Sequence, residues 1–223
     1  MKGDRDQALR ARLKAAYASM AAEREARALP GWKLGERLDI RERFGTAGVR
    51  SLLDLGSGPG VDAAFFREQG LDVICIDLSG EMVASCRAKG LEAYEMDLAD
   101  LHFPDASFDA VYALNSLLHV PRVEFESVLR EIRRVLVPGG LFYLGIYGGI
   151  DSEGVWEDDD YRPKRFFSFR TDAAMRHTVE AVFEVDRFRT IDVETSDPEL
   201  HFQSMVLRRP IVEDEPAEKR RSA

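Results

Sequence analysis

The sequence is poor in the residues that build covalent or metal-based scaffolds, with two cysteines and four histidines among 223 residues. Cys75 falls in an expected strand and Cys86 on the helix after it, so we expect two reduced thiols rather than a disulfide or a metal site. No apolar run is long enough to span a bilayer. The start of the chain, MKGDRDQALRARLKAAY, lacks the apolar core of a secretory signal. These absences predict a cytoplasmic protein that does not act at a membrane.

Positive charge is also scarce: 31 Lys and Arg face 40 Asp and Glu, which gives a net charge of −9. This balance argues against a broad phosphate-binding surface, and we therefore expect no nucleic-acid partner. Hydrophobic residues at 45% and charged residues at 32% are typical of a soluble globular protein. The length suits one domain of three layers, and the chain shows no internal repeat. Both a monomer and a homodimer remain open.

The stretch Ser51 to Asp77, SLLDLGSGPGVDAAFFREQGLDVICID, organises the rest of the chain. It begins with a short apolar run that is typical of a buried parallel strand, and a glycine-rich turn follows. Residues 61–69 then read as a helix that ends at Gly70. A second apolar strand, residues 73–76, ends in Asp77. The pattern is strand, glycine turn, helix, strand and acid.

This pattern predicts a nucleoside site. Glycines let a ligand approach bare backbone, and the first amides of the helix attract an anionic group. An acid at the tip of the second strand can accept hydrogen bonds from both ribose hydroxyls. A dinucleotide fingerprint would need a third glycine or an alanine three residues after Gly58, where this chain has Val61. The ligand is therefore not expected to be a dinucleotide.

Three stretches resemble class I S-adenosylmethionine-dependent methyltransferases, in particular the small-molecule group that includes ubiquinone and menaquinone biosynthesis enzymes. LDLGSGPG resembles the first motif of that family, and NSLLHVP at residues 115–121 resembles its fourth motif. RVLVPGGLFYLGIYGG, residues 134–149, is similar to the helix, turn and fifth strand of the family. The resemblance covers residues 50–147 with specific motifs and the remainder by topology alone.

The resemblance implies an α/β fold, with a doubly wound, mostly parallel seven-stranded sheet and an N-terminal helical cap. We expect five parallel strands followed by an antiparallel end. Residues 1–48 are expected to form helices that cap the site, one over 4–28 and one over 32–44. Residues 49–210 then form the methyltransferase domain, in which 148–170 is an irregular substrate loop or lid. The charged tail, 211–223, is expected to be disordered.

S-adenosylmethionine is the implied cofactor, and S-adenosylhomocysteine the product. In the family resemblance, Asp97 accepts from the adenine amino group and the amide of Leu98 meets the ring. Met82 either packs on the adenine or belongs to the core. The full set of expected cofactor-binding residues is Asp54, Gly56, Ser57, Gly58, Gly60, Asp77, Leu78, Met82, Asp97, Leu98 and Asn115.

Two residues are candidates for the chemistry. His119 lies just after Asn115, where the resemblance puts the reaction centre, and the ordinary pKa of histidine suits proton removal near neutrality. It either acts as a base or packs its loop against the sheet. Tyr17 either touches the methyl donor or acceptor or merely docks its helix. We expect no metal, because the acidic run at residues 157–160 reads as a solvated loop.

Residues after the fifth strand are expected to form the acceptor pocket, with Tyr147 and Trp156 as contacts. In the run RFFSFR, Arg165 shares a face with Phe167 and Phe169, and Arg170 points to the other face. Arg165 or Arg170 can clamp a carboxylate or phosphate of the acceptor. Alternatively, these arginines pair with the acidic run just upstream.

The sequence thus predicts methyl transfer from S-adenosylmethionine to O or N of a small molecule, a carboxylate being one such acceptor. A protein or RNA methyltransferase is the second reading, although the acidic balance counts against RNA. A module that binds the nucleoside without catalysis is the third. The sequence does not name the acceptor.

Overall fold

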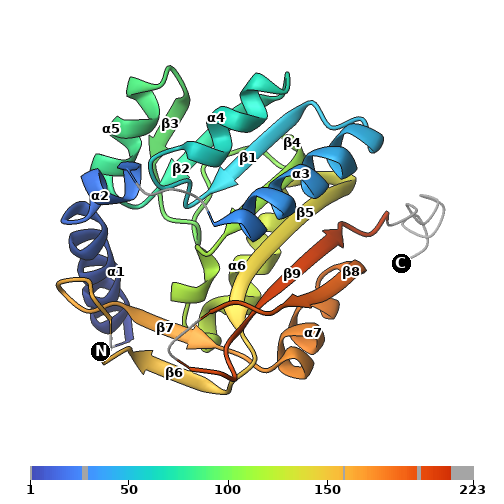
Figure 1. Cartoon of the computed structure of the whole chain (residues 1–223). Helices are drawn as coiled ribbons and strands as arrows, with labels where there is room; N and C mark the ends of the chain where they lie inside the picture. Colours follow the sequence, from blue (N-terminus) through green and yellow to red (C-terminus); the bar gives the residue numbers. More distant parts are fainter. Residues whose placement is uncertain (1, 27–29, 158, 195–196, 212–223) are drawn as a thin grey trace, which may run out of the picture.

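A seven-stranded sheet forms the centre of the molecule (Figure 1). The computed structural model describes residues 2–26, 30–157, 159–194 and 197–211. Strands β1, β2, β3, β4 and β5 run parallel, and β9 is antiparallel to both of its neighbours. This arrangement confirms the predicted fold class. In spatial order the strands are β3 (Glu92–Glu95), β2 (Asp72–Asp77), β1 (Ser51–Leu55), β4 (Phe108–Leu114), β5 (Leu136–Gly148), β9 (His201–Arg208) and β8 (Glu184–Ile191).

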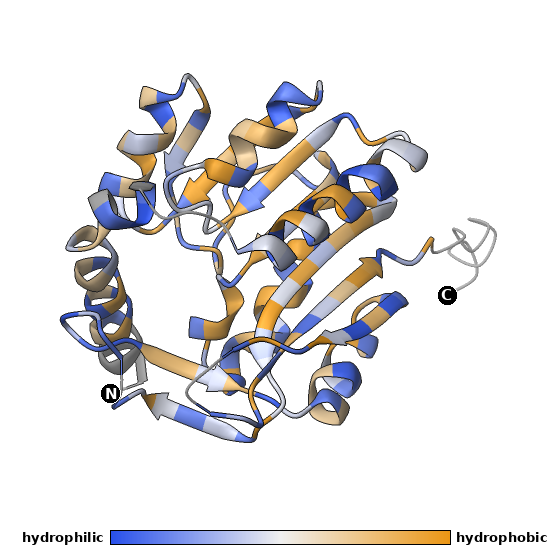
Figure 2. Ribbon diagram, viewed as in Figure 1, coloured by the Kyte–Doolittle hydropathy of each residue, from blue (hydrophilic) through white to orange (hydrophobic). Residues whose placement is uncertain are grey.

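Helices cover both faces of the sheet, and each face has its own apolar core. One core lies beneath α3 (Gly31–Thr46), α4 (Val61–Glu68) and α5 (Gly80–Ala88). The other lies beneath α6 (Arg122–Val135) and α7 (Asp172–Glu180). The central strands are apolar along most of their length because both of their faces are covered (Figure 2). No described helix combines the length and apolar character that a bilayer crossing requires.

Two helices begin at a side-chain cap. The Ser79 hydroxyl accepts a hydrogen bond from the Met82 amide, 3.4 Å away, at the start of α5. At the start of α7, the Thr171 hydroxyl accepts from the Ala174 amide at 3.3 Å. Each cap satisfies an amide that has no partner within its own helix, so both helices begin where the sequence indicates.

The single helix expected over residues 4–28 is wrong in its middle. The structure has α1 (Lys2–Ala18) and α2 (Ala21–Ala26), separated by a turn. At that turn the Ser19 hydroxyl donates to the carbonyl of Ala16 at 2.8 Å, a local bond that competes with helix continuation. Only α1 and α2 lie over the strand ends, whereas α3 packs into the sheet's core through Ile40 and Phe44 (Figure 1).

The segment expected to be irregular, residues 148–170, contains a hairpin. Strand β6 (Ser152–Val155) pairs with antiparallel β7 (Phe166–Phe169) in a second, two-stranded sheet. The rings of Phe167 and Phe169 stack with centroids 5.4 Å apart, and Trp156 packs edge-on against Phe169 at 5.3 Å. This aromatic packing stabilises a strand pair that turn signals alone do not reveal. The expected disordered tail lies outside the described residues from 212 onward.

Candidate active site

The glycine turn after β1 is fixed by bonds to the tip of β2. Gly56 and Gly58 have φ of +66° and +54°, the left-handed region that glycine adopts without strain. The Gly58 amide donates to one oxygen of Asp77 at 2.9 Å, and the Ser79 amide donates to the other oxygen at 2.9 Å. Burial raises the pKa of Asp77, and these backbone bonds oppose that rise. The carboxylate therefore lies beside bare glycine backbone, as the sequence predicts.

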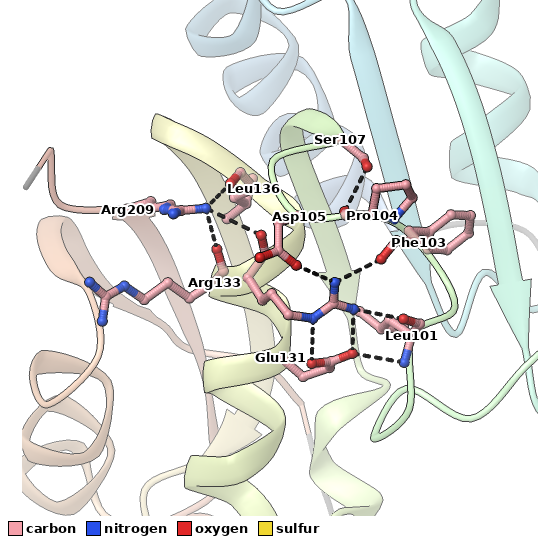
Figure 3. Close-up of polar contacts among 10 residues, drawn as sticks. Leu101, Phe103, Pro104, Asp105, Ser107, Glu131, Arg133, Leu136 and Arg209 are labelled. Carbon is pink, nitrogen blue, oxygen red and sulfur yellow. Dashed lines mark hydrogen bonds and ion pairs between the residues drawn. The ribbon is translucent and has the colours of Figure 1, made fainter.

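The loop after β3 carries Asp97 and Leu98 and is attached firmly to α6. The Arg134 guanidinium donates to the carbonyls of Leu101 and Phe103, both at 2.7 Å. The Glu131 carboxylate accepts from the Leu101 amide at 3.1 Å and also binds Arg134 (Figure 3). These bonds fix the loop beside the tip of β3, where an acid can meet a ligand.

These strand-end turns line one cavity of about 960 Å³, a volume that includes its open mouth. We call this wall the floor: the turn 56–58 and the segments 76–79, 96–99 and 114–119. Helices α1 and α2 line the opposite side, and residues 159–169 contact α1 through Arg165 and Tyr17; we call α1, α2 and residues 159–169 the lid. Of the residues predicted to bind cofactor or catalyse, the cavity is lined by Gly56, Gly58, Asp77, Leu78, Asp97, Leu98, Asn115, His119 and Tyr17.

Four other predicted cofactor residues lie behind the floor. Met82 is fully buried in the core, and its contact with adenine stays a prediction. Gly60 packs against the side chains of α5, and the Ser57 hydroxyl faces the carbonyl of Ile76 at 3.4 Å. Asp54 is 3% exposed within β1, and burial raises the pKa of its carboxyl well above the ordinary value. These residues support the turn from beneath.

Asn115, at the tip of β4, presents an unused acceptor beside the cavity. Its φ of +57° is left-handed, a conformation that asparagine tolerates better than most residues. Its amide donates to the carbonyl of Gly145 at 2.8 Å, which ties the turn to β5. Its side-chain Oδ1 is buried and, among the described residues, has no hydrogen-bond partner. A buried acceptor of this kind suits a ligand that brings a donor.

Tyr17 and His119 meet across the cavity and form a hydrogen-bonded pair. The Tyr17 oxygen lies 2.6 Å from His119 Nε2, and His119 Nδ1 lies 2.7 Å from the carbonyl oxygen of Phe166. Since a carbonyl only accepts, Nδ1 carries the proton, and neutral Nε2 accepts from the tyrosine. Burial lowers the pKa of His119 to about 3, so the ring is neutral at physiological pH.

Arg165 holds the tyrosine from its other side. Its Nη1 donates to the Tyr17 oxygen at 3.2 Å, while Nη2 binds an oxygen of Asp159 at 2.7 Å. The guanidinium also stacks on the Tyr161 ring, 3.5 Å from its centre. The acidic run therefore supplies a partner for Arg165, which is the alternative that the sequence left open. Its assignment to acceptor binding stays a prediction.

The remaining predicted acceptor residues are not among those that line the cavity. Tyr147 packs against Phe202, with ring centres 5.6 Å apart, and Trp156 joins the aromatic cluster of the hairpin. Arg170 is 5% exposed and lies over the Phe125 ring at 3.9 Å. Burial lowers the pKa of Arg170 to about 10. The described contacts of these three residues are packing contacts, and their assignment to acceptor binding stays a prediction.

Sequence reasoning missed two arginines of the lid. Arg10 on α1 forms ion pairs with Asp97 and Glu124. Arg24 on α2 lies over the glycine turn. Arg10 is seven positions before Tyr17 on the same helix, so helical spacing could have placed both on the face toward the cavity. Nothing in the local sequence distinguishes Arg24. Among the described residues, no group of three or more potential metal ligands gathers.

Comparison with known proteins agrees with this geometry. Residues 53–144 match the family model described as a methyltransferase domain. A sterol 24-C-methyltransferase from Gibberella zeae is 36% identical over 96 residues, which are 43% of this chain and 23% of that protein. A ubiquinone biosynthesis O-methyltransferase from Xanthomonas oryzae pv. oryzae is 35% identical over 116 residues, 48% of this chain and 47% of that protein.

Solved structures share the fold at lower identity. The 1,6-didemethyltoxoflavin-N1-methyltransferase of Burkholderia thailandensis, solved with 1,6-didemethyltoxoflavin and S-adenosylhomocysteine, aligns with a TM-score of 0.67 and 20% identity. That alignment covers 90% of this chain and 88% of the other. The chain spans less than half the length of these curated relatives. Residues 53–144 thus match a methyltransferase domain, and the relatives and the shared fold support a class I S-adenosylmethionine-dependent methyltransferase.

Proposed function

We propose that the protein transfers a methyl group from S-adenosylmethionine to O or N of a small molecule. The observation that carries this proposal is the single cavity that joins the glycine turn, two strand-tip acids and the Tyr17–His119 pair. Gly58 presents bare backbone to the cavity, and the unused Asn115 oxygen offers an acceptor, so the residues fit the cofactor.

In this proposal each strand tip has one role. Asp77 accepts hydrogen bonds from the ribose hydroxyls, and Asp97 accepts from the adenine amino group. Asn115 Oδ1 accepts from the ammonium group of the amino-acid end. The cofactor supplies a methyl carbon that accepts the nucleophile's electron pair as its bond to sulfur breaks, with sulfur leaving as a neutral thioether. The protein's own contribution is then positioning in a dry site, worth roughly 7–11 kcal/mol of barrier.

The hydrogen bonds of the Tyr17–His119 pair affect which kind of acceptor the site can use. With Nδ1 bound to a carbonyl and Nε2 bound to the tyrosine hydroxyl, the imidazole offers no free lone pair in this state. A histidine whose pKa is about 3 is also a weak base. The arrangement therefore favours an acceptor that needs little deprotonation, such as a carboxylate or a free amine. The pair orients that acceptor instead of removing a strongly held proton.

Tritium-labelled S-adenosylmethionine tests the proposal directly. The protein is incubated with the labelled donor and a metabolite library, and labelled product is identified by chromatography. Transfer to a compound of low mass supports the proposal, while label that appears only in protein or RNA of a size-separated lysate favours the macromolecular alternative. Tight binding of the donor without transfer to any acceptor favours the non-catalytic module.

A further inference from the structure

The order of the strands places the two ends of the expected cofactor. Along the floor, Asp97 follows β3, Asp77 ends β2, and the glycine turn follows β1, with these strands adjacent in that order. If adenine lies at Asp97 and ribose at Asp77, the amino-acid end lies over the glycine turn. This assignment rests on the proposed function.

Arg24 is the cation that covers this end of the cavity. Its Nη2 lies 3.4 Å from the point that a Cβ on Gly58 would occupy. Its Nη1 donates to the Tyr161 hydroxyl at 3.3 Å, and its guanidinium carbon lies 5.0 Å from the centre of the Tyr17 ring. Arg24 also lines the cavity itself. The guanidinium therefore lies close to bare backbone at the glycine-turn end of the cavity.

Arg10, the other arginine that lines the cavity, and Arg165 of the lid each have a carboxylate partner. Arg165 binds Asp159, and Arg10 binds Asp97 and Glu124. No carboxylate oxygen in the described part of the chain pairs with Arg24, and its Nε is buried without a hydrogen-bond partner there. A guanidinium is always charged and has five donors in a planar fork that matches a carboxylate. An unsatisfied donor of this kind costs free energy unless a ligand supplies the acceptor.

We propose that Arg24 binds the carboxylate of the amino-acid end of S-adenosylmethionine, and so joins the lid to cofactor occupancy. The donor and its product both carry this carboxylate, and the group is remote from the reacting carbon. Arg24 therefore stabilises the ground state and the transition state equally. Its loss raises the KM for the donor and leaves kcat little changed.

Isothermal titration calorimetry with two ligands tests this role. S-adenosylhomocysteine carries the carboxylate, whereas 5′-methylthioadenosine keeps the nucleoside and thioether but lacks the amino-acid group. For Arg24→Gln we expect an affinity loss of roughly 10- to 100-fold for S-adenosylhomocysteine and less than about twofold for 5′-methylthioadenosine. Arg24→Lys keeps the charge without the fork and should fall between wild type and Arg24→Gln.

A matched control is available on the same lid. Arg12 donates to the carbonyl of Lys164 and is absent from the cavity wall, so Arg12→Gln should leave both affinities unchanged. Unchanged binding of S-adenosylhomocysteine by Arg24→Gln overturns the proposal, including the case in which only the acceptor's KM rises. An equal loss for both ligands also overturns it, because lid closure alone would explain that result. Failure of the proposed function looks different, since wild type would then bind neither ligand.

Discussion

The floor and the lid of the cavity are built by different kinds of bond. Backbone groups fix the floor: the amide of Gly58 binds Asp77, and the amide of Asn115 binds the carbonyl of Gly145. Side chains hold the lid, through pairs such as Lys14–Glu95, whose side chains are 44% and 49% exposed. Exposed ion pairs contribute about 0–1 kcal/mol each. The floor is thus held by backbone hydrogen bonds, and the lid by side-chain contacts, of which the exposed ion pairs contribute little stability.

The largest expected effect comes from breaking the floor. Gly58→Arg places a side chain where Arg24 already lies and forces a left-handed residue with φ of +54°. We expect no detectable binding of S-adenosylhomocysteine by calorimetry. Gly35→Arg is the matched control, because nothing lies within 4 Å of a Cβ there. Wild-type affinity in Gly58→Arg would contradict the position assigned to the ligand.

The next largest effect should come from breaking the buried ion pair between Arg165 and Asp159 in the lid. Arg165→Gln leaves the Asp159 carboxylate, whose side chain is 4% exposed, without its cation. Removing one partner of a buried pair costs about 3–5 kcal/mol. We expect faster hydrogen exchange across residues 159–169, with the exchange of β1 and β4 unchanged. Lys164→Gln, whose partner Glu157 is 81% exposed, should have little effect. Equal protection in both variants would show that the lid does not depend on this pair.

Stability should depend on pH through His119. The pKa of His119 is about 3 in the fold and about 6.5 in the unfolded chain. Below pH 6.5 the unfolded chain therefore binds a proton that the folded protein does not. The free energy of unfolding decreases by about 1.4 kcal/mol for each unit by which the pH is lowered. Urea denaturation between pH 5 and 7.5 gives the free energy of unfolding as a function of pH. In His119→Gln the slope of that curve should be smaller by the amount that one bound proton contributes. A variant with the same slope as wild type would refute the buried, neutral assignment.

The smallest expected effect comes from breaking the exposed ion pair between Lys14 and Glu95. Lys14→Gln removes the pair with Glu95 at the rim of the floor. We expect S-adenosylhomocysteine to dissociate about two- to threefold faster, because one screened pair is worth less than about 1 kcal/mol. Stopped-flow measurements at low and high salt check this, and the difference between the two proteins should vanish at high salt. A tenfold change that persists in salt would mean that the lid is held more firmly than its exposure suggests.

The floor could be predicted from the sequence because its signals are local. The spacing of Gly56, Gly58 and Asp77 specifies a turn and an acid at adjacent strand tips, and the structure brings them together. The caps at Ser79 and Thr171 depend on residues only three positions away. Each such feature is decided within a few residues, so periodicity and turn chemistry are sufficient.

The lid could not be predicted in the same way, because its contacts join distant parts of the chain. Tyr17 meets His119 and Arg165, and no local pattern marks the partners. The break between α1 and α2 depends on Ser19, whose hydroxyl also donates to the carbonyl of Arg162. The sequence shows both the acidic run at residues 157–160 and the run RFFSFR. Only the fold shows that Arg165 of the second run pairs with Asp159 of the first.

The distance along the chain between the two halves of the lid also sets an order of assembly. The floor lies within residues 51–119, so a chain emerging from its N-terminus has synthesised all of it before residue 120. Tyr17 of α1 is made before the floor, and its partner Arg165 follows it by 148 positions. Contacts between such distant segments form late, since closing a long loop costs entropy before the contact repays it. The nascent protein therefore contains every residue of the floor before the hairpin that holds the lid has been made, while the bonds from the floor to Arg134 and Gly145 also form later.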